Sequence, residues 1–447
     1  MSEELFEKME EESELNAYLP ATNKKKRGKI ARMVTSVLLA LACFVGGGFV
    51  TWFSLDKEVR LLVRIKALID KEYYKELSDE VFYGAVFDAV DDELDDYSYY
   101  MTADEYKTQS GESAGNRSGI GLVFSTVDAD KNPQMRIVRV NGNSPAEEVG
   151  LCEGSFVTAF GKSETELIES VVFKEFEAFL ADCATGENFV LRVEHEGGTE
   201  LVSLAKKAYV ENYVFYRTST EAYGFTGKNA SNLEKRGAPL ACLNADTAYI
   251  RIMKFGGTAD KNFAKAMDLF QQQGKKNLVL DLRENGGGYV DTMREIASYF
   301  CKGATEKKPV VAIADYGEKK TNLKATGNLY GKYFGTDSRI CVLADSGTAS
   351  ASEALIGCMV DYGATSYGDI CLSYRGGVAK TFGKGIMQST YYISGTGDSL
   401  KLTTAEILWP SGHSIHGRGV LPEDGTKTAK AGETEDEEIT LAIAQLF

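Results

Sequence analysis

Hydrophobic positions change their spacing along this chain, and each change predicts a different kind of structure. Apolar residues recur every three or four positions over 57–77 and 79–94, which predicts two amphipathic helices. Short alternating or apolar runs over 118–127, 134–140 and 188–196 predict strands instead. The chain therefore passes from a helical lead-in to a small region rich in β-structure.

Strand patterns and helix patterns alternate after residue 241. The predicted strands are 247–255, 277–283, 309–314 and 339–344, and the predicted helices are 259–273, 290–301 and a third from Ser352. This alternation is typical of an α/β layer with crossover connections. The polar stretch 216–240 is predicted to be a linker or mobile loop. We therefore predict a lead-in at 56–112, a β domain at 113–207, a linker at 208–240 and an α/β domain at 241–447.

One apolar segment, 33–55, differs from the rest of the chain. It carries roughly 20 residues without a charge, enough to cross a bilayer. The basic stretch 24–32 precedes it, so the positive-inside rule predicts a cytoplasmic tail at 1–32. A cleaved signal peptide is the alternative, but the apolar run is long and lacks a clear small-x-small site. We predict an uncleaved single-pass anchor in the cell membrane, with everything after it extracytoplasmic.

Composition narrows the partners and cofactors. The formal net charge is −15, which argues against a nucleic-acid partner because phosphate binding needs a basic face. The eight cysteines include no C-x-x-C pair and no zinc-like spacing, so we predict no metal site. Most of these cysteines are expected to be small buried hydrophobic residues. No cofactor is implied.

Serines gather in the stretch "ADSGTASASEALIGCMVDYG" (344–363), where an apolar strand runs into small residues and then a helix pattern. A serine nucleophile needs a base within hydrogen-bond reach. The chain has three histidines. His195 is predicted to lie on the surface, whereas His413 or His416 could partner a serine. No G-x-S-x-G elbow is present, so a His-assisted hydrolase is only an alternative.

A lysine is the other candidate base. Its ordinary pKa of about 10.4 leaves little neutral amine at pH 7, but burial can lower that value. Lys384 lies between Gly383 and Gly385 in an apolar setting, and Gln388 follows four residues later. Lys380 is a rival that lacks the glycine flanks and the following glutamine. These residues make Lys384 the stronger candidate.

The segments "SASE" (350–353) and "FGKGIMQ" (382–388) together resemble the carboxy-terminal processing proteases. These are tail-specific Ser/Lys peptidases of the S41 type that carry an embedded PDZ domain. The resemblance implies that Ser350 is the nucleophile, Lys384 the general base and Gln388 its orienting partner. Ser352 is expected to cap the following helix beside Glu353.

Two further stretches carry the same resemblance. "LVLDLRENGGGYVDTM" (278–293) is similar to a strand and glycine turn of this family, and "WPSGHSIHGRGVLPED" (409–424) to its closing stretch. The resemblance implies that Gly287 or Gly288 donates a backbone N–H to the oxyanion, with the N–H of Ala351 as the second donor.

The segments "GIGL" (119–122) and "SPAEEVGL" (144–151) resemble a bacterial PDZ domain. The resemblance implies that a peptide C-terminus is captured by backbone N–H groups while the peptide adds a strand. The implied carboxylate-binding loop consists of Gly119, Ile120, Gly121 and Leu122. A generic small β domain with glycine-rich turns is the alternative.

Together these features predict an α+β and α/β multidomain protein with a membrane helix, a helical lead-in, a PDZ domain and a layered protease core. The implied function is a membrane-anchored serine endopeptidase that cleaves proteins held by their C-terminal tails through an acyl-enzyme. Family analogy also implies a homodimer, and the need for an activating partner stays open. The stretch 364–380 is longer than the family pattern, so a PDZ-bearing scaffold with an inactive protease domain is the rival hypothesis.

Overall fold

The computed structural model describes residues 54–73, 75–125, 135–170, 172–195, 197–374, 377–431 and 435–446. The chain divides into two compact units, residues 1–90 and residues 91–447. The predicted cytoplasmic tail and nearly all of the predicted anchor lie outside the described residues. Among the helices that are described, none has the length and apolar character needed to cross a membrane.

The first unit contains helices α3 (Lys57–Glu72) and α4 (Asp79–Asp91), which confirm the two amphipathic helices. Lys66 connects them, because its Nζ lies 2.5 Å from an Asp70 oxygen and 2.7 Å from an Asp79 oxygen. Both helices leave large apolar side chains exposed, among them Val59, Leu61, Val63, Ile65, Leu68, Val81, Phe87 and Val90.

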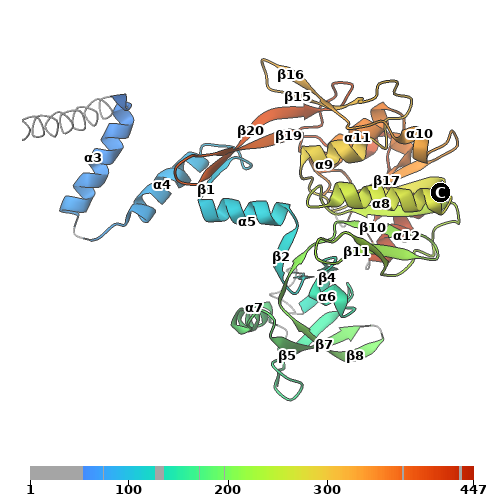
Figure 1. The fold of residues 1–447 in the computed structure, drawn as a ribbon, viewed down its shortest axis with the longest axis horizontal. Coiled ribbons are helices and arrows are strands. Elements are labelled where there is room, and N and C mark those ends of the chain that lie inside the picture. The colour runs from blue at the N-terminus through green and yellow to red at the C-terminus, as the bar shows by residue number, and fades with distance from the viewer. Residues whose placement is uncertain are drawn as a thin grey trace, which may run out of the picture. The chain divides into compact units, whose positions relative to one another are not determined.

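The main sheet of the second unit has eight strands, several of which are labelled in Figure 1. Its strand order is β12 (Asn232–Lys235), β11 (Ala222–Thr226), β10 (Val214–Arg217), β13 (Thr247–Ile252), β14 (Asn277–Asp281), β17 (Ile340–Ala344), β18 (Ile370–Tyr374) and β21 (Lys427–Lys430). Within this sheet, β13, β14, β17, β18 and β21 run parallel to one another, whereas β10, β11 and β12 pair in antiparallel fashion. The predicted α/β layer is therefore present.

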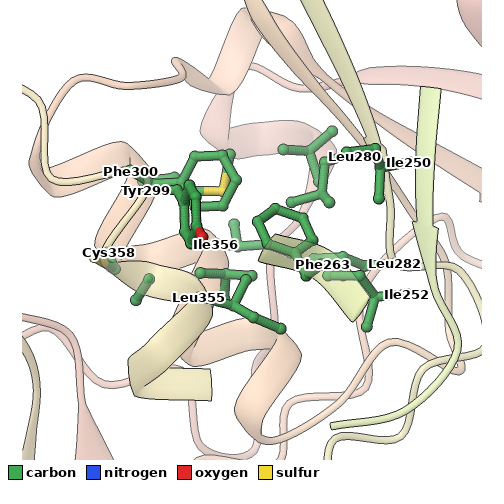
Figure 2. Close-up of a cluster of buried hydrophobic side chains, with 14 of the residues drawn as sticks. Ile250, Ile252, Phe263, Leu280, Leu282, Tyr299, Phe300, Leu355, Ile356 and Cys358 are labelled. Carbon is green, nitrogen blue, oxygen red and sulfur yellow. The ribbon is translucent and has the colours of Figure 1, made fainter. Parts of the chain in front are cut away.

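Helices cover both faces of this sheet. Ile250 of β13 and Leu280 of β14 pack with α8 (Ala259–Gln272), α9 (Val290–Ala297) and α11 (Ala351–Asp361), as Figure 2 shows in part. The alternate residues Tyr249 and Val279 pack against α12 (Glu435–Leu446) on the other face. Strands buried on both faces become continuous apolar runs, which is why these strands were predictable. Cys358, a free thiol, is buried in this core as expected.

A second sheet in this unit contains β1 (Tyr99–Met101), β20 (Ser399–Leu408), β15 (Val310–Asp315), β16 (Lys320–Lys324) and β19 (Ile386–Tyr392). The strand predicted at 309–314 exists, but it pairs here with β16 and β20 and does not join the main sheet. Helix α5 (Ala103–Ser113) follows β1, and Thr102 and Glu105 form a capping box at its start.

The small β domain, residues 115–210, has its own core. Its main sheet has the order β3 (Leu122–Phe124), β4 (Met135–Val140), β5 (Phe156–Gly161), β7 (Asn188–His195) and β8 (Gly198–Ala205), with β6 (Leu167–Ile168) beside β5. A separate pair joins β2 (Asn116–Gly119) to β9 (Lys207–Val210). Helices α6 (Pro145–Glu148) and α7 (Phe173–Asp182) complete it, and Phe160, Phe176 and Phe189 fill its core.

One sequence expectation about a connecting segment is corrected. The stretch 216–240, expected as a linker or mobile loop, contains β11 and β12, which extend the main sheet. β12 is the edge strand and much of it is exposed, whereas β11 beside it is mostly buried. The long stretch 364–380 contributes β18, which pairs between β17 and β21 inside the sheet. Part of this stretch is therefore a buried strand of the main sheet.

Candidate active site

Ser350 stands at the turn between β17 and α11, where it occupies the N-cap position of the helix. Its φ of +57° is unusual for a residue with a side chain, so this turn is strained. Thr348 holds the turn from below, because its Oγ1 donates to the Leu282 carbonyl at 2.8 Å and accepts from the Asp345 N–H at 2.9 Å. These two hydrogen bonds of Thr348 therefore hold the strained turn in place.

The Glu353 carboxylate joins the serine turn to the glycine-lysine loop. One oxygen, Oε2, accepts the backbone N–H of Ser350 at 3.0 Å and that of Lys384 at 2.9 Å. The other oxygen, Oε1, accepts the N–H of Gly383 at 2.8 Å and the hydroxyl of Thr381 at 2.6 Å. The backbone nitrogens of Ser350 and Lys384 thus lie within two hydrogen-bond lengths of each other.

Glu353 is fully buried, with an exposed fraction of 0%. Burial raises the pKa of its carboxyl group, and the four hydrogen bonds it accepts oppose that rise. The sequence pattern identified Glu353 only as a neighbour of the helix cap. The available signal was its position three residues after Ser350, which is the capping-box spacing.

Ser352 does not cap the helix, contrary to the sequence expectation. Ser350 holds the N-cap position, and the buried Ser352 hydroxyl donates to the Asn285 carbonyl at 2.9 Å. Asn285 lies in the glycine turn that follows β14. Ser352 therefore connects the start of α11 to that turn.

Lys384 is half-buried, and its Nζ lies 3.9 Å from the centroid of the Tyr97 ring. Burial lowers the pKa of its amine, the positive charge of Lys401 lowers it further, and Asp95 acts in the opposite direction. A lowered pKa increases the fraction of neutral amine that is able to accept a proton. The lysine setting predicted from the flanking glycines is therefore consistent with the structure.

Within the described residues, no hydrogen bond joins the Lys384 amine to the Ser350 hydroxyl or to Gln388. Gln388 lies on β19, and its Nε2 donates instead to the Thr403 hydroxyl of β20 at 3.1 Å. Catalytic hydrogen bonds are often unformed without substrate. The structure thus brings the backbone of both candidate residues together but leaves their side chains unconnected.

The glycine turn after β14 lies against Ser350. At Gly287, φ is +99° and a Cβ would come within 2.8 Å of the Ser350 Cβ. At Gly288, φ is +142° and a Cβ would come within 2.2 Å of the Phe255 carbonyl oxygen. Only glycine allows both close approaches.

The two candidate oxyanion donors of the turn, the N–H groups of Gly287 and Gly288, differ in whether they already donate a hydrogen bond. The Gly287 N–H already donates to the Asn285 Oδ1 at 2.9 Å. The N–H groups of Gly288 and Ala351 have no hydrogen-bond partner in the part of the chain that the structure describes. Gly288 is therefore the better placed of the two glycines to pair with Ala351.

Replacing Gly287 by alanine is expected to lower peptidase turnover by about 100-fold, because displacing the neighbouring Gly288 N–H would have the effect of losing one oxyanion donor. The new Cβ would have to displace Ser350 or the turn itself, and φ is unfavourable for alanine. Gly286→Ala is the matched control, because no atom lies within 4 Å of its Cβ position. Measured kcat values that are equal in the two variants would contradict this account of the turn.

Neither candidate histidine contacts the serine turn in the interactions of the described residues. His413 is exposed and lies edge-on to Trp409, with ring centroids 4.9 Å apart. His416 is also exposed, and its N–H donates to the Ser414 hydroxyl at 3.2 Å. His195 lies in the small β domain, 3.8 Å from Glu200. The His-assisted alternative gains no support from this geometry.

The proposed carboxylate-binding loop follows β2. Gly119 and Gly121 have φ values of +139° and +83°, and Ile120 between them is buried. The Ile120 carbonyl accepts the N–H of Ala146 at 2.9 Å, which ties the loop to α6. Leu122 then opens β3, an edge strand of the described sheet. The predicted loop residues thus form one turn at the start of an edge strand.

Comparison with known proteins supports the protease motifs. Residues 246–424 match the model of peptidase family S41. A "Probable CtpA-like serine protease" of Staphylococcus epidermidis is 29% identical over 382 residues, which cover 84% of this chain and 68% of the relative. The protein of the same name from Staphylococcus saprophyticus is 28% identical over 413 residues, covering 90% and 73%.

A solved structure, an S41 protease from Bacteroides fragilis, has a similar fold. The TM-score is 0.52 with 17% identity, over 84% of this chain and 90% of that one. The matched residues 246–424 contain the serine turn, the glycine turn and the lysine loop described above. The resemblance to the carboxy-terminal processing proteases of peptidase family S41 is therefore confirmed, and the chain is a serine-type peptidase.

Proposed function

We propose that this peptidase is a membrane-anchored endopeptidase that cleaves proteins captured by their C-terminal tails, with Ser350 as nucleophile and Lys384 as general base. The observation that carries the dyad is the Glu353 carboxylate, which accepts the backbone N–H groups of both residues. A buried acid that accepts four hydrogen bonds keeps two distant segments in one place.

In the proposed mechanism, neutral Lys384 takes the proton of the Ser350 hydroxyl while the oxygen attacks the peptide carbonyl carbon. The N–H groups of Ala351 and Gly288 stabilise the resulting oxyanion. Lys384 then gives the proton to the leaving amine, and an acyl-enzyme remains. Water, deprotonated by Lys384, hydrolyses this ester and restores Ser350.

The Lys384 amine must leave the face of Tyr97 for this chemistry. A cation is attracted to an aromatic face, so this contact favours the protonated amine. Once the amine is neutral, that attraction is lost. Gln388 is the proposed orienting partner after this movement, which requires it to exchange its bond with Thr403.

The small β domain is the proposed PDZ domain. Its strand β3 is an edge strand and follows the glycine loop 119–122, so an extended peptide could add beside it. The peptide carboxylate would then face the backbone N–H groups of the loop. The apolar segment 33–55 supports the proposed anchor, with the catalytic domain on the extracytoplasmic side.

The test uses the purified full-length chain and an unfolded test protein that ends in an apolar tail. A matched substrate carries the same tail with its C-terminal carboxylate converted to an amide. We expect cleavage of the free-acid substrate and a clearly higher KM for the amide. Cleavage is measured by mass spectrometry of the fragments. Equal KM values would refute tail capture. Tail binding without any cleavage would favour the scaffold alternative.

Activity is expected to rise with pH as Lys384 loses its proton. Because the pKa of this amine is lowered, the rise should occur below the ordinary lysine pKa of 10.5. Lys401→Met removes a positive charge that lowers this pKa, so its profile should move to higher pH. The measurement is kcat/KM against pH for both proteins. A profile that does not move in the variant would contradict this assignment of the base.

A further inference from the structure

A cavity of about 460 Å³ lies within the second unit. Residues 139–153 of the small β domain form one wall, and residues 211–253, from the strands β10, β11 and β13 and their connections, form the other. None of Ser350, Glu353 and Lys384 lines it. The proposed peptidase chemistry therefore does not account for this cavity.

One polar group in the cavity wall has no partner. Asn212 is 1% exposed and lines the cavity. Its Oδ1 accepts the Val214 N–H at 3.0 Å, whereas its Nδ2 has no hydrogen-bond partner among the described residues. A buried donor without a partner destabilises a fold. An acceptor on a bound molecule would remove that cost.

Arg139 supplies a positive charge in the same wall. Its Nε donates to the Asn141 Oδ1 at 3.3 Å, and no carboxylate of the described chain lies within 4 Å of its guanidinium. Another guanidinium of the cavity is already used, because Arg236 lies 3.2 Å from a Glu147 oxygen. Arg139 is therefore available to an anion.

Arg139 and Asn212 are held close to the same turn. Arg139 contacts the side chain of Asn141, and the Asn212 N–H donates to the carbonyl of Gly142 at 3.0 Å. The remaining lining includes the apolar side chains of Val140, Leu151, Phe215 and Met253. The lining also includes the carboxylates of Glu147, Glu153 and Glu211. A cavity of this size with apolar walls and converging polar groups is typical of a site for a small molecule.

We propose that this cavity binds an organic carboxylate with an apolar body, whose carboxylate pairs with Arg139 and accepts from the Nδ2 of Asn212. Planar guanidinium and carboxylate groups match each other, which favours a carboxylate over other anions. The C-terminal residue of a short peptide and a free short-chain acid both have this chemistry. The test separates these two sources.

The test is isothermal titration of the full-length chain with hexanoate, with the peptide Ala-Ala-Leu and with the amide of that peptide. We expect Arg139→Gln to weaken carboxylate binding by about tenfold, as for loss of a charge-assisted hydrogen bond. Ala238→Phe places a ring in the cavity from an exposed wall position and should also abolish binding. Arg192→Gln is the control, because this arginine pairs with Glu169 at 2.6 Å and does not line the cavity.

Each outcome decides the proposal. Binding of hexanoate that both cavity variants weaken supports a site for free acids. Binding of the peptide alone, lost in its amide and weakened by both variants, supports a site for peptide C-termini. Peptide binding that neither variant changes belongs to the loop 119–122 and overturns the proposal. Absence of binding by either carboxylate also overturns it, and a melting temperature close to wild type excludes misfolding of the variants.

Discussion

Replacing Ser350 by alanine, or Lys384 by alanine, is expected to reduce peptide-bond cleavage by about 10⁴-fold or more. The first change removes the attacking oxygen, and the second removes the group that accepts its proton. Residues that act as one unit are not additive, so the double variant should be no less active than either single variant. Fragment formation from the unfolded substrate, followed over time by mass spectrometry, measures all three.

The controls are chosen from the same segments. Ser346 is an exposed serine of the same turn region, and Lys380 is a lysine of the same loop that forms no bond to Glu353. Ser346→Ala and Lys380→Met should keep activity within about threefold of wild type, because neither side chain takes part in the proposed chemistry.

Three outcomes separate the competing hypotheses. Loss of activity only in the Ser350 and Lys384 variants supports the Ser/Lys dyad. Loss in His413→Ala or His416→Ala, with Lys384→Ala still active, would support the His-assisted hydrolase instead. A wild-type chain that binds tails but never cuts would support the scaffold. The absent bond between Ser350 and Lys384 makes this last comparison necessary.

Glu353→Ala is expected to lower both stability and turnover. It leaves the N–H groups of Ser350, Gly383 and Lys384 and the hydroxyl of Thr381 without their acceptor. The loss of such a buried network is expected to cost about 3–5 kcal/mol of unfolding free energy. Because the two loops would then separate, kcat should fall by about 100-fold or more, whereas KM should change little.

Graded variants test whether Glu353 positions the site or only stabilises the fold. Glu353→Gln keeps the shape of the side chain but has one acceptor oxygen, so we expect an intermediate loss in kcat. Thr381→Val removes one donor to the carboxylate, along with the acceptor of the Val420 N–H. Urea unfolding and kcat are measured for each. If kcat follows stability in every variant, with no extra loss at Glu353, the positioning role is refuted.

The local patterns were the most predictable part of the fold. The predicted ranges agree closely with strands β13, β14 and β17 and with helices α8 and α11. The strands were predictable because burial on both faces requires an unbroken apolar run. Where a strand is exposed, this signal disappears. β12 was read as part of a linker for that reason, whereas β11 is mostly buried but is a run of only five residues between polar segments. The strand at 310–315 was found, but its pairing with β20 depends on residues almost a hundred positions away.

The candidate site shows the same division between local and distant signals. Ser350 and Lys384 were identified from short motifs, and the glycine turn from its strand and its glycines. The role of Glu353 was missed because its partners Thr381, Gly383 and Lys384 lie about 30 residues later. The contact of Tyr97 with Lys384 is still more distant in sequence.

The sequence by itself determined the family, the order of the elements and the residue types at the serine turn, the glycine turn and the lysine loop. These features depend on side-chain periodicity and on glycine at positions of positive φ. Both can be recognised from residues that are close together in the sequence. The tertiary structure alone decided that one buried carboxylate joins the serine and lysine loops, that Lys384 rests on Tyr97, and that 216–240 belongs to a sheet. Each of these depends on hydrogen bonds or packing between segments far apart in the chain. The periodicity of a segment does not indicate which distant segment it contacts.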